Sequence, residues 1–280
     1  MILTSTANER IKHARRVREG RERGLLFIEG ERLVEEAVAA PALRLITCFH
    51  TPTPSARMAQ SLAAMSCERI ATDDAVLASL SDTQHPQGII ALAERPCFTL
   101  ADLWKSRTPP GSQTPATTFP AATPPASLLL VALDRVQDPG NLGTLIRTAE
   151  AAGAHGLIAL AGSADAYSPK ALRSAMGSAF RLPIITDVAA ESLLDACAAH
   201  GLRVVAAAGS ATTLHHNYDW TSPTLLLLGN EGRGVSDALL ARCDAQVRIP
   251  LQAPVESLNV AAAGAVLLFE AARQRSSSQH

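Results

Sequence analysis

The most restrictive feature of this sequence is the stretch 247–274, where a short strand pattern, a proline, a polar loop and a small-residue helix follow one another. The strand expected at Val247–Ile249 must end at Pro250, because proline has no N–H to donate to a strand ladder. A short loop with Glu256 and Ser257 follows. The chain then turns into a helical pattern, so the sequence predicts a strand–loop–helix unit near its C-terminal end.

The helix after this loop is dominated by alanine and glycine in its first half. Such small side chains let another backbone approach closely, either elsewhere in this chain or in the same helix of a second subunit. A buried core helix is the simpler interpretation of this stretch alone. The apolar positions expected to share one stripe are Leu258, Val260, Ala261, Ala265, Leu268 and Phe269.

A glycine-rich loop follows another strand pattern upstream. Thr224–Leu228 is a continuous apolar run, and three of the next six residues are glycines. This pattern favours a loop around a ligand at the C-terminal end of a parallel strand, although a glycine turn without a ligand is the alternative. The G-x-x-G-x-G order is not the dinucleotide fingerprint, and Ile249–Pro250 occupy the place of its acidic residue. A nicotinamide-dependent oxidoreductase is therefore disfavoured.

A third pattern begins with the apolar run Leu128–Leu133, which is followed by polar residues and then by a helix. The apolar residues Leu142, Leu145, Ile146 and Ala149 would fill one stripe of that helix. Arg147 falls outside the stripe and is expected to point toward the strand ends or the solvent. An isolated arginine on a polar helix face is usually only solvated.

Together the three patterns resemble the three motifs of the SpoU, or TrmH-type, RNA ribose methyltransferases. The matching segments begin at Asn141-x-Gly143, at Gly229 and at Ile249, in the same order and spacing, and they cover about the last 150 residues. The resemblance implies a SPOUT fold, an α/β domain with a mostly parallel sheet and a trefoil knot. Knots are rare exceptions to chain topology, and neither composition nor periodicity indicates one here.

The resemblance also implies the chemistry and the site. The family uses S-adenosyl-L-methionine and methylates a ribose 2′-hydroxyl, which is mainly a problem of positioning. Ala208, at an adjacent strand end, is the least certain cofactor contact. The implied catalytic residues are Arg147, Asn141, Glu231, Ser257 and Asn259. The implied cofactor-binding residues are Gly229, Ile249, Leu258, Asn230, Gly232 and Ala208.

The family proposal makes the arginine matching Arg147 a general base. A guanidinium has a pKa above about 12 and does not lose its proton in a protein. We therefore expect Arg147 to stabilise the developing alkoxide electrostatically. Asn141 would orient the substrate or Arg147, whereas Glu231 would pair with an arginine or hold its loop. For Glu231, a purely structural salt bridge is an equal alternative.

The composition limits the remaining classes. A net charge of -1 over 280 residues excludes a uniformly basic nucleic-acid binder, so RNA affinity must come from local patches.

The five cysteines show no C-x-x-C spacing, so we expect no disulfide framework. The adjacent His215 and His216 have no carboxylate or cysteine cluster beside them, so we expect no metal site. No apolar run approaches the roughly 18 residues of a membrane span, and no signal peptide is recognisable, so a cytoplasmic location is expected.

The N-terminal segment Thr4–Arg23 is the clearest local patch, with seven cations against three glutamates. Such a segment suits phosphate contacts, although a solvated helix face is the alternative. The candidate RNA-binding residues are Arg10, Lys12, Arg15 and Arg16.

Short strand and helix patterns after this segment indicate a small α/β unit. The expected strands are Leu25–Ile28, Leu43–Phe49 and Gly88–Ala93, and the expected helices are Gly30–Ala39, Ser55–Met65 and Asp73–Ser81. The segments Phe27–Gly30 and Pro86–Ile89 resemble the ribosomal-protein-L30e-like substrate-binding domain that precedes many catalytic domains of the family.

The domain division follows from a change of composition. Residues 107–127 hold six prolines and five threonines and should form an extended linker that allows the N-terminal domain more than one position. We therefore expect an L30e-like RNA substrate-binding domain at 1–106, a linker at 107–127 and a SPOUT methyltransferase domain at 128–280. The strands expected in the last domain are Leu128–Leu133, Gly156–Leu160, Leu202–Ala206, Thr224–Leu228 and Ala245–Ile249, with helices from Pro169 and over Ala190–His200.

Several alternatives stay open. A non-catalytic RNA-binding protein would have no reason to keep Asn141, Arg147 and Glu231 together. The two-domain layout resembles the enzymes that act on rRNA more than the shorter tRNA enzymes, so 23S rRNA is expected by analogy, with a tRNA 2′-O-methyltransferase as the alternative. A homodimer through the C-terminal helix is a further expectation from the family.

Overall fold

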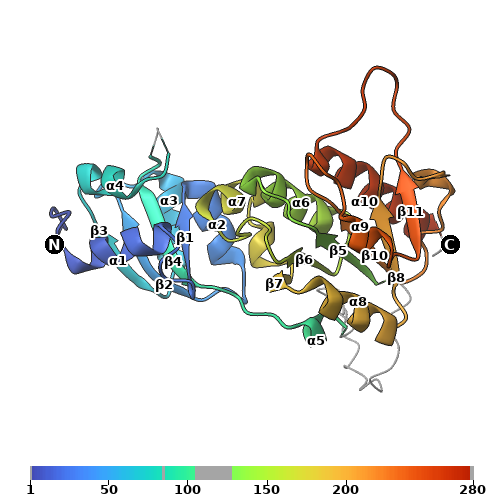
Figure 1. Cartoon of the computed structure of the whole chain (residues 1–280). Helices are drawn as coiled ribbons and strands as arrows, with labels where there is room; N and C mark the ends of the chain where they lie inside the picture. The colour runs from blue at the N-terminus through green and yellow to red at the C-terminus, as the bar shows by residue number, and fades with distance from the viewer. Residues whose placement is uncertain (1, 84–85, 105–127, 278–280) are drawn as a thin grey trace. The chain divides into compact units, whose positions relative to one another are not determined.

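The structure, a computed structural model, describes residues 2–83, 86–104 and 128–277 (Figure 1). These residues form two compact units, one made of Met1–Cys97 with Asp165–Arg181 and the other of Phe98–Ala164 with Leu182–His280. The linker expected at 107–127 lies outside the described residues, and the expected domain boundaries stay predictions. None of the helices in the described ranges combines the length and apolar character that crossing a membrane requires.

The first unit contains a four-stranded mixed sheet in the order β1-β4-β2-β3, in which only β2 and β3 are parallel. Its N-terminal helix buries Ile11, Ala14 and Val17 and leaves its cations outside the core. The strands are β1 (Leu25–Glu29), β2 (Leu45–His50), β3 (Glu68–Ala71) and β4 (Ile89–Glu94). The helices are α1 (Glu9–Arg18), α2 (Glu31–Ala39), α3 (Ala56–Ala64), α4 (Asp74–Leu80), α7 (Pro169–Ala175) and the 3₁₀ helix η1 (Ser178–Phe180).

Helices α7 and η1 belong to the first unit although they come from the C-terminal half of the sequence. Ser168 caps α7 and Pro169 is its first residue, as the sequence predicts. Arg173 of α7 forms an ion pair with Asp82 at 2.9 Å, and Arg181 forms one with Glu36 at 2.5 Å. The division expected from the sequence assigns this segment to the domain at 128–280. Sequence order alone gives no sign of its ion pairs with Asp82 and Glu36.

The second unit contains a seven-stranded sheet in the order β7-β6-β5-β10-β8-β11-β9, and every strand pair in it is parallel. The strands are β5 (Leu129–Leu133), β6 (Gly156–Leu160), β7 (Ile184–Val188), β8 (Arg203–Ala207), β9 (Thr213–Leu214), β10 (Thr224–Leu228) and β11 (Ala245–Arg248). The helices are α5 (Leu100–Leu103), α6 (Pro139–Ala151), α8 (Ala190–Ala199), α9 (Asp237–Leu240), α10 (Val260–Ser277) and the 3₁₀ helix η2 (His215–Asn217). The parallel α/β class is therefore confirmed.

Helices cover both faces of this sheet, with α6 and α10 along one face and α8 along the other (Figure 1). The central strands β5 and β10 are buried along their whole length. A strand buried on both faces reads as a continuous apolar run, which is why these two strands were predictable. The other three expected strands of this unit are also present, each within one residue at either end.

Three strands were not predicted from the sequence: β3, β7 and β9. Strand β3 is an edge strand that exposes Glu68 and Arg69, so it lacks an apolar run. Strand β7 is also at an edge, and its Asp187 has a positive φ of 61° that interrupts the pairing with β6. Strand β9 has only two residues, which is too short for any periodic signal.

Helix α10 packs against α6, and its small residues serve that contact. A Cβ atom on Gly264 would lie 2.4 Å from Leu145 Cδ2 and 3.0 Å from Leu228 Cδ1. The predicted apolar stripe is wrong at both ends, because Leu258 precedes the helix and is 38% exposed, and Phe269 lies on the outer face and is 52% exposed. The face that is buried consists of Val260, Ala261, Gly264, Leu267, Leu268 and Ala271.

We predict that Gly264→Val lowers the free energy of unfolding by about 1–3 kcal/mol, the usual cost of overpacking a tight contact. The matched control is Ala262→Val on the exposed face of the same helix, which changes only helix propensity, by less than about 0.7 kcal/mol. Chemical denaturation measures both. Equal losses in the two variants would contradict the close packing of α10 on α6.

Candidate functional site

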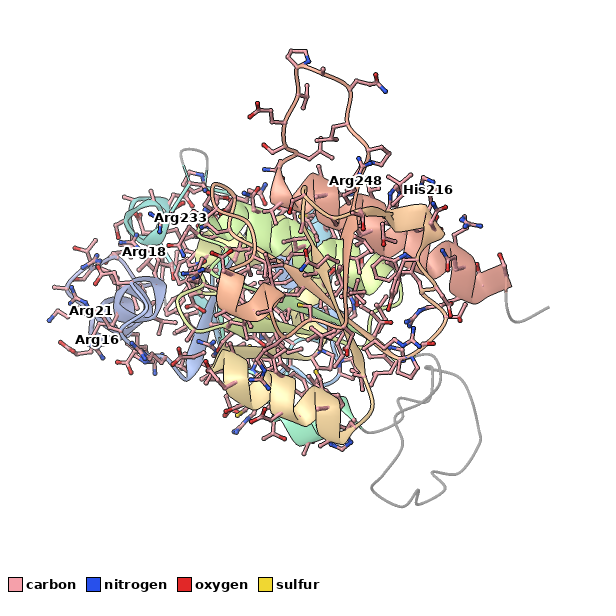
Figure 2. The ribbon with its side chains drawn as sticks, turned by 45° about the vertical axis from the view of Figure 1, so that its right-hand side comes forward. Arg16, Arg18, Arg21, His216, Arg233 and Arg248 are labelled. Atoms are coloured by element: carbon pink, nitrogen blue, oxygen red, sulfur yellow. The ribbon has the colours of Figure 1, made fainter. Side chains whose placement is uncertain are left out.

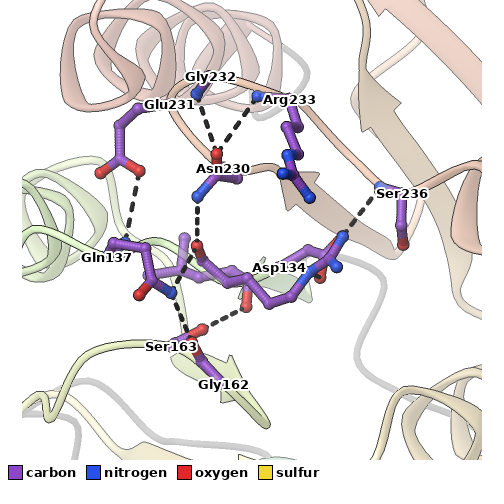
Figure 3. A network of polar contacts seen from close by, with 11 residues as sticks. Asp134, Gln137, Gly162, Ser163, Asn230, Glu231, Gly232, Arg233 and Ser236 are labelled. Carbon is purple, nitrogen blue, oxygen red and sulfur yellow. Dashed lines mark hydrogen bonds and ion pairs between the residues drawn. The ribbon is translucent and has the colours of Figure 1, made fainter.

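The loop after β10 is a tight turn built around Gly229 and Asn230. A Cβ atom on Gly229 would lie 2.0 Å from the backbone of Gly234, so only glycine fits there. The Asn230 side chain accepts hydrogen bonds from the backbone N–H groups of Gly232 and Arg233 at 3.0 and 3.3 Å, and it donates to the carbonyl of Arg135 at 2.9 Å (Figure 3). Asn230 and Gly232, expected as cofactor contacts, therefore shape this loop.

A buried carboxylate fixes the same loop to the end of β5. Asp134 is only 4% exposed and accepts hydrogen bonds from the backbone N–H of Ser236 at 2.9 Å and from Arg135 Nε at 3.0 Å (Figure 3). Sequence reasoning assigned no role to Asp134. The available signal was an aspartate placed directly after a fully buried strand, where charge persists only with partners.

A chain of three polar side chains connects the three motifs. Glu231 accepts a hydrogen bond from Asn141 Nδ2 at 3.0 Å, and Asn141 Oδ1 accepts one from Asn259 Nδ2 at 3.0 Å. Both asparagines are held in place at the start of a helix. Asn141 lies in the first turn of α6, and its backbone N–H donates to the N-cap residue Asp138. Asn259 accepts a hydrogen bond from the N–H of Ala261 at 2.9 Å at the start of α10. The three predicted residues therefore meet.

The Glu231 carboxylate is held in its charged form. Partial burial raises its pKa, but hydrogen bonds from the Asn141 side chain and from backbone N–H groups, including those of Gln137 and Asp138, outweigh burial and lower the pKa below its ordinary value of 4.5. A carboxylate with a lowered pKa is a weak base. Glu231 therefore acts better as an anchor of its loop than as a proton acceptor.

Arg147 is not part of this chain of hydrogen bonds. It is exposed on α6, while Leu142, Leu145, Ile146 and Ala149 are fully buried as predicted. Its guanidinium makes no hydrogen bond or ion pair with any other residue that the structure describes. Ser257 is likewise exposed, in the loop 250–259 that rises above α10 in Figure 1. The structure thus leaves both candidates accessible to an incoming substrate.

The candidate cofactor residues lie at the C-terminal ends of three neighbouring strands. Gly229 follows β10, Ala208 follows Ala207 at the end of β8, and Ile249 follows β11. The N–H of Ala208 donates to the carbonyl of Val247 at 3.0 Å, which joins two of these ends. Small and neutral residues at these ends suit an adenosyl group held by main-chain hydrogen bonds, so the residues present fit S-adenosylmethionine. Leu258, the remaining candidate, is exposed in the following loop.

The four candidate RNA-binding residues lie on α1 of the first unit. Three of them form exposed ion pairs: Arg10 with Glu68 at 2.6 Å, Lys12 with Glu9 at 2.8 Å and Arg16 with Glu22 at 3.1 Å. Exposed ion pairs contribute little to stability, so a phosphate can replace the carboxylate at small cost. Arg15 makes no such contact with any described residue.

His215 and His216 contact each other edge to face, with ring centroids 5.1 Å apart. No group of three or more possible metal-ligating side chains occurs in the described part of the chain. The indole N–H of Trp220 donates to the carbonyl of His215 at 2.8 Å, and Gln274 of α10 receives the N–H of Trp220 at 3.0 Å. This segment therefore ties η2 to the C-terminal helix.

Comparison with known proteins identifies the family. Residues 128–269 match the SpoU rRNA Methylase family, and residues 8–91 match the MRM3-like substrate binding domain. The chain belongs to the SpoU rRNA Methylase family, which confirms the resemblance seen in its three motifs.

Relatives and solved structures agree with this assignment over nearly the whole chain. The 23S rRNA (guanosine(2553)-2′-O)-methyltransferase RlmP of Bacillus subtilis is 32% identical over 95% of this chain and 97% of its own. The SpoU methyltransferase AviRb of Streptomyces viridochromogenes in complex with AdoMet is 30% identical with a TM-score of 0.82, covering 96% and 99% of the two chains. An AdoMet-bound rRNA methyltransferase from Sinorhizobium meliloti is 30% identical with a TM-score of 0.80, covering 98% and 97%.

We predict that Asn141→Ala raises the pKa of Glu231 toward 4.5, because it removes the side-chain donor that most lowers it. In the wild type, the folded-state pKa lies below the unfolded value, so the stabilising contribution of Glu231 is present above pH 4.5 and is lost as the pH falls through the folded pKa. Carboxyl chemical shifts titrated by NMR measure this pKa. Thr144→Ala, on the same helix, should leave it unchanged, and an unchanged value in Asn141→Ala would contradict the contact.

Proposed function

We propose that this protein transfers the methyl group of S-adenosyl-L-methionine to a ribose 2′-hydroxyl in RNA, with 23S rRNA as the substrate. The observation that carries the proposal is the Glu231–Asn141–Asn259 chain, which joins all three motifs at the ends of parallel strands. Its relatives named as 23S rRNA 2′-O-methyltransferases support the choice of RNA. A tRNA 2′-O-methyltransferase is the alternative.

Different residues around the site would bind the cofactor, position the loops and stabilise the developing charge. S-adenosylmethionine, when bound, supplies an electrophilic methyl group on a sulfonium. Gly229, Ala208 and Ile249 would hold its adenosyl part through backbone groups, and the Asn141–Glu231 contact would keep the loops at the right separation. Arg147 would stabilise the negative charge that develops on the ribose oxygen, since its guanidinium carries a permanent charge and is bound to none of the residues that the structure describes.

We predict that Arg147→Ala lowers the rate of methyl transfer about 10²- to 10³-fold, the usual effect of removing one charge-stabilising group. Its affinity for S-adenosylmethionine should stay at the wild-type value, because Arg147 forms no hydrogen bond or ion pair with the strand-end residues. Transfer of labelled methyl groups to unmodified rRNA and tRNA pools measures the rate and tests the RNA class. Arg242→Ala removes an exposed arginine that pairs with Asp195 at 2.8 Å and serves as the control.

Full transfer by Arg147→Ala would contradict the role given to this arginine. Label in tRNA alone would favour the tRNA alternative. Wild-type protein that binds rRNA and the cofactor but transfers no methyl group to either pool would favour a non-catalytic RNA-binding protein.

The first unit is proposed to bind the RNA substrate through the cations of α1. The match of residues 8–91 to the MRM3-like substrate binding domain supports this role. A cytoplasmic location is proposed because ribosomal RNA is the expected substrate.

The trefoil knot expected from the family is proposed for the C-terminal segment. Two features support it: β11 lies beyond β8 in the sheet, and α10 returns to pack against α6.

We propose that the protein is a homodimer through α10. Val266 and Phe269 expose apolar surface on this helix, 39% and 52% respectively, and Val255 in the preceding loop is 53% exposed. Large apolar side chains that gather on one surface mark interaction sites.

We predict that the wild type sediments as a dimer at micromolar concentration and that Val266→Asp with Phe269→Asp sediments as a monomer, because burying two carboxylates in an apolar interface is costly. Ser192→Asp, on the exposed side of α8 on the other face of the sheet, adds a charge away from this surface and should remain dimeric. A monomeric wild type would contradict the proposal.

A further inference from the structure

Most arginines of the second unit are engaged by groups of the same unit. Arg135 pairs with Asp134, Arg242 with Asp195 and Arg273 with Glu270, at 2.7–3.0 Å. Arg275 donates to the carbonyls of Trp220 and Ser222, and Arg203 interacts electrostatically with Asp219. Each of these side chains therefore has a structural function.

Three arginines of this unit differ from the rest. Arg147, Arg233 and Arg248 have no hydrogen-bonded, ionic or electrostatic side-chain partner among residues 128–164 and 182–277. Arg147 has its proposed role in catalysis. Arg233 and Arg248 lie in the two segments that carry the cofactor candidates, one in the loop after β10 and one at the last position of β11, directly before Ile249.

Neither of these two arginines forms an ion pair with an acid in the described part of the chain. Arg233 is exposed, and its side chain leaves the loop away from Glu231, whose carboxylate faces Gln137 (Figure 3). Arg248 pairs through its backbone with Leu214 of β9, next to His215 and His216, and Figure 2 shows Arg248 and His216 near each other at the base of the loop 250–259. No carboxylate among the described residues pairs with either guanidinium, so both arginines are available to an anion.

The sheet order sets the separation of the two strand ends from which the segments of Arg233 and Arg248 leave. Strand β8 lies between β10 and β11, so the two strand ends are two strand spacings apart, roughly 10 Å. Two segments that leave the sheet that far apart suit two separate anions. The strand ends between them are those proposed to hold the cofactor, so a nucleotide placed for methylation would lie between two cations.

We propose that Arg233 and Arg248 bind two separate phosphates of the RNA backbone, on either side of the nucleotide that is methylated. The planar guanidinium offers paired N–H donors that match a phosphate. The inference rests on the proposed function and deepens it, because it assigns backbone contacts to two residues outside the catalytic and cofactor sets. Phosphate contacts position an RNA without reading its sequence, so these arginines fix the register of the ribose at the site.

The test measures the affinity for unmodified 23S rRNA, transcribed in vitro, at several salt concentrations. Each phosphate contact in a single strand contributes about -0.7 to the slope of log K against log salt concentration. Arg233→Gln and Arg248→Gln should each make the slope less negative by about 0.7, and the double variant by about 1.4. Arg248→Lys should keep the wild-type slope, because it keeps the charge.

Two controls separate this effect from damage to the fold or to the cofactor loops. Arg242→Gln removes an exposed arginine that is already paired and should leave the slope unchanged. Both test variants should bind S-adenosylmethionine with wild-type affinity, and restoration of the slope in Arg248→Lys excludes a folding defect at that position.

Wild-type slopes in both glutamine variants would overturn the inference while the methyl transfer of the wild type keeps the proposed function. A reduced slope with no methyl transfer by the wild type would support the two phosphate contacts and contradict the proposed function. Wild-type protein without affinity for the RNA would overturn both.

Discussion

The hydrogen-bonded chain Glu231–Asn141–Asn259 is the interaction on which the site depends, because it is where three segments distant in sequence meet. Each member also fixes local structure: Asn259 begins α10, Asn141 lies in the first turn of α6, and Glu231 receives backbone N–H groups of the segment before α6. Loss of one member therefore loosens a helix start as well as a contact. This coupling gives a site made of loops the fixed geometry that methyl transfer requires.

Close helix packing makes this chain of side chains possible. Because Gly264 leaves no gap beside Leu145 and Leu228, α10 lies close enough to α6 for Asn259 to reach Asn141. Close packing also requires glycine at Gly229, where the backbone of Gly234 occupies the space that a side chain would need. The alanines and glycines that make the C-terminal sequence look featureless thus position its polar residues.

Much of this arrangement was predictable from the sequence, for definite physical reasons. Strands buried on both faces gave continuous apolar runs, and the stripe that includes Leu145 gave α6. The meeting of Asn141, Glu231 and Asn259 followed from the family resemblance and not from periodicity. The position of Asp134 directly after a fully buried strand was a signal, but its partner Ser236, 102 residues away, lies outside the motifs of the family resemblance. The exposure of Phe269 was also missed, because composition does not show which face of an alanine-rich helix is covered.

Whether the chain methylates a ribose oxygen is decided by the chemical identity of its product. RNA methylated by the protein with labelled S-adenosylmethionine would be digested to nucleosides, and the labelled species would be identified by mass spectrometry. We expect the label in a single 2′-O-methyl nucleoside derived from 23S rRNA. Label on a base would contradict the assignment of the ribose oxygen as the acceptor while it retained the cofactor.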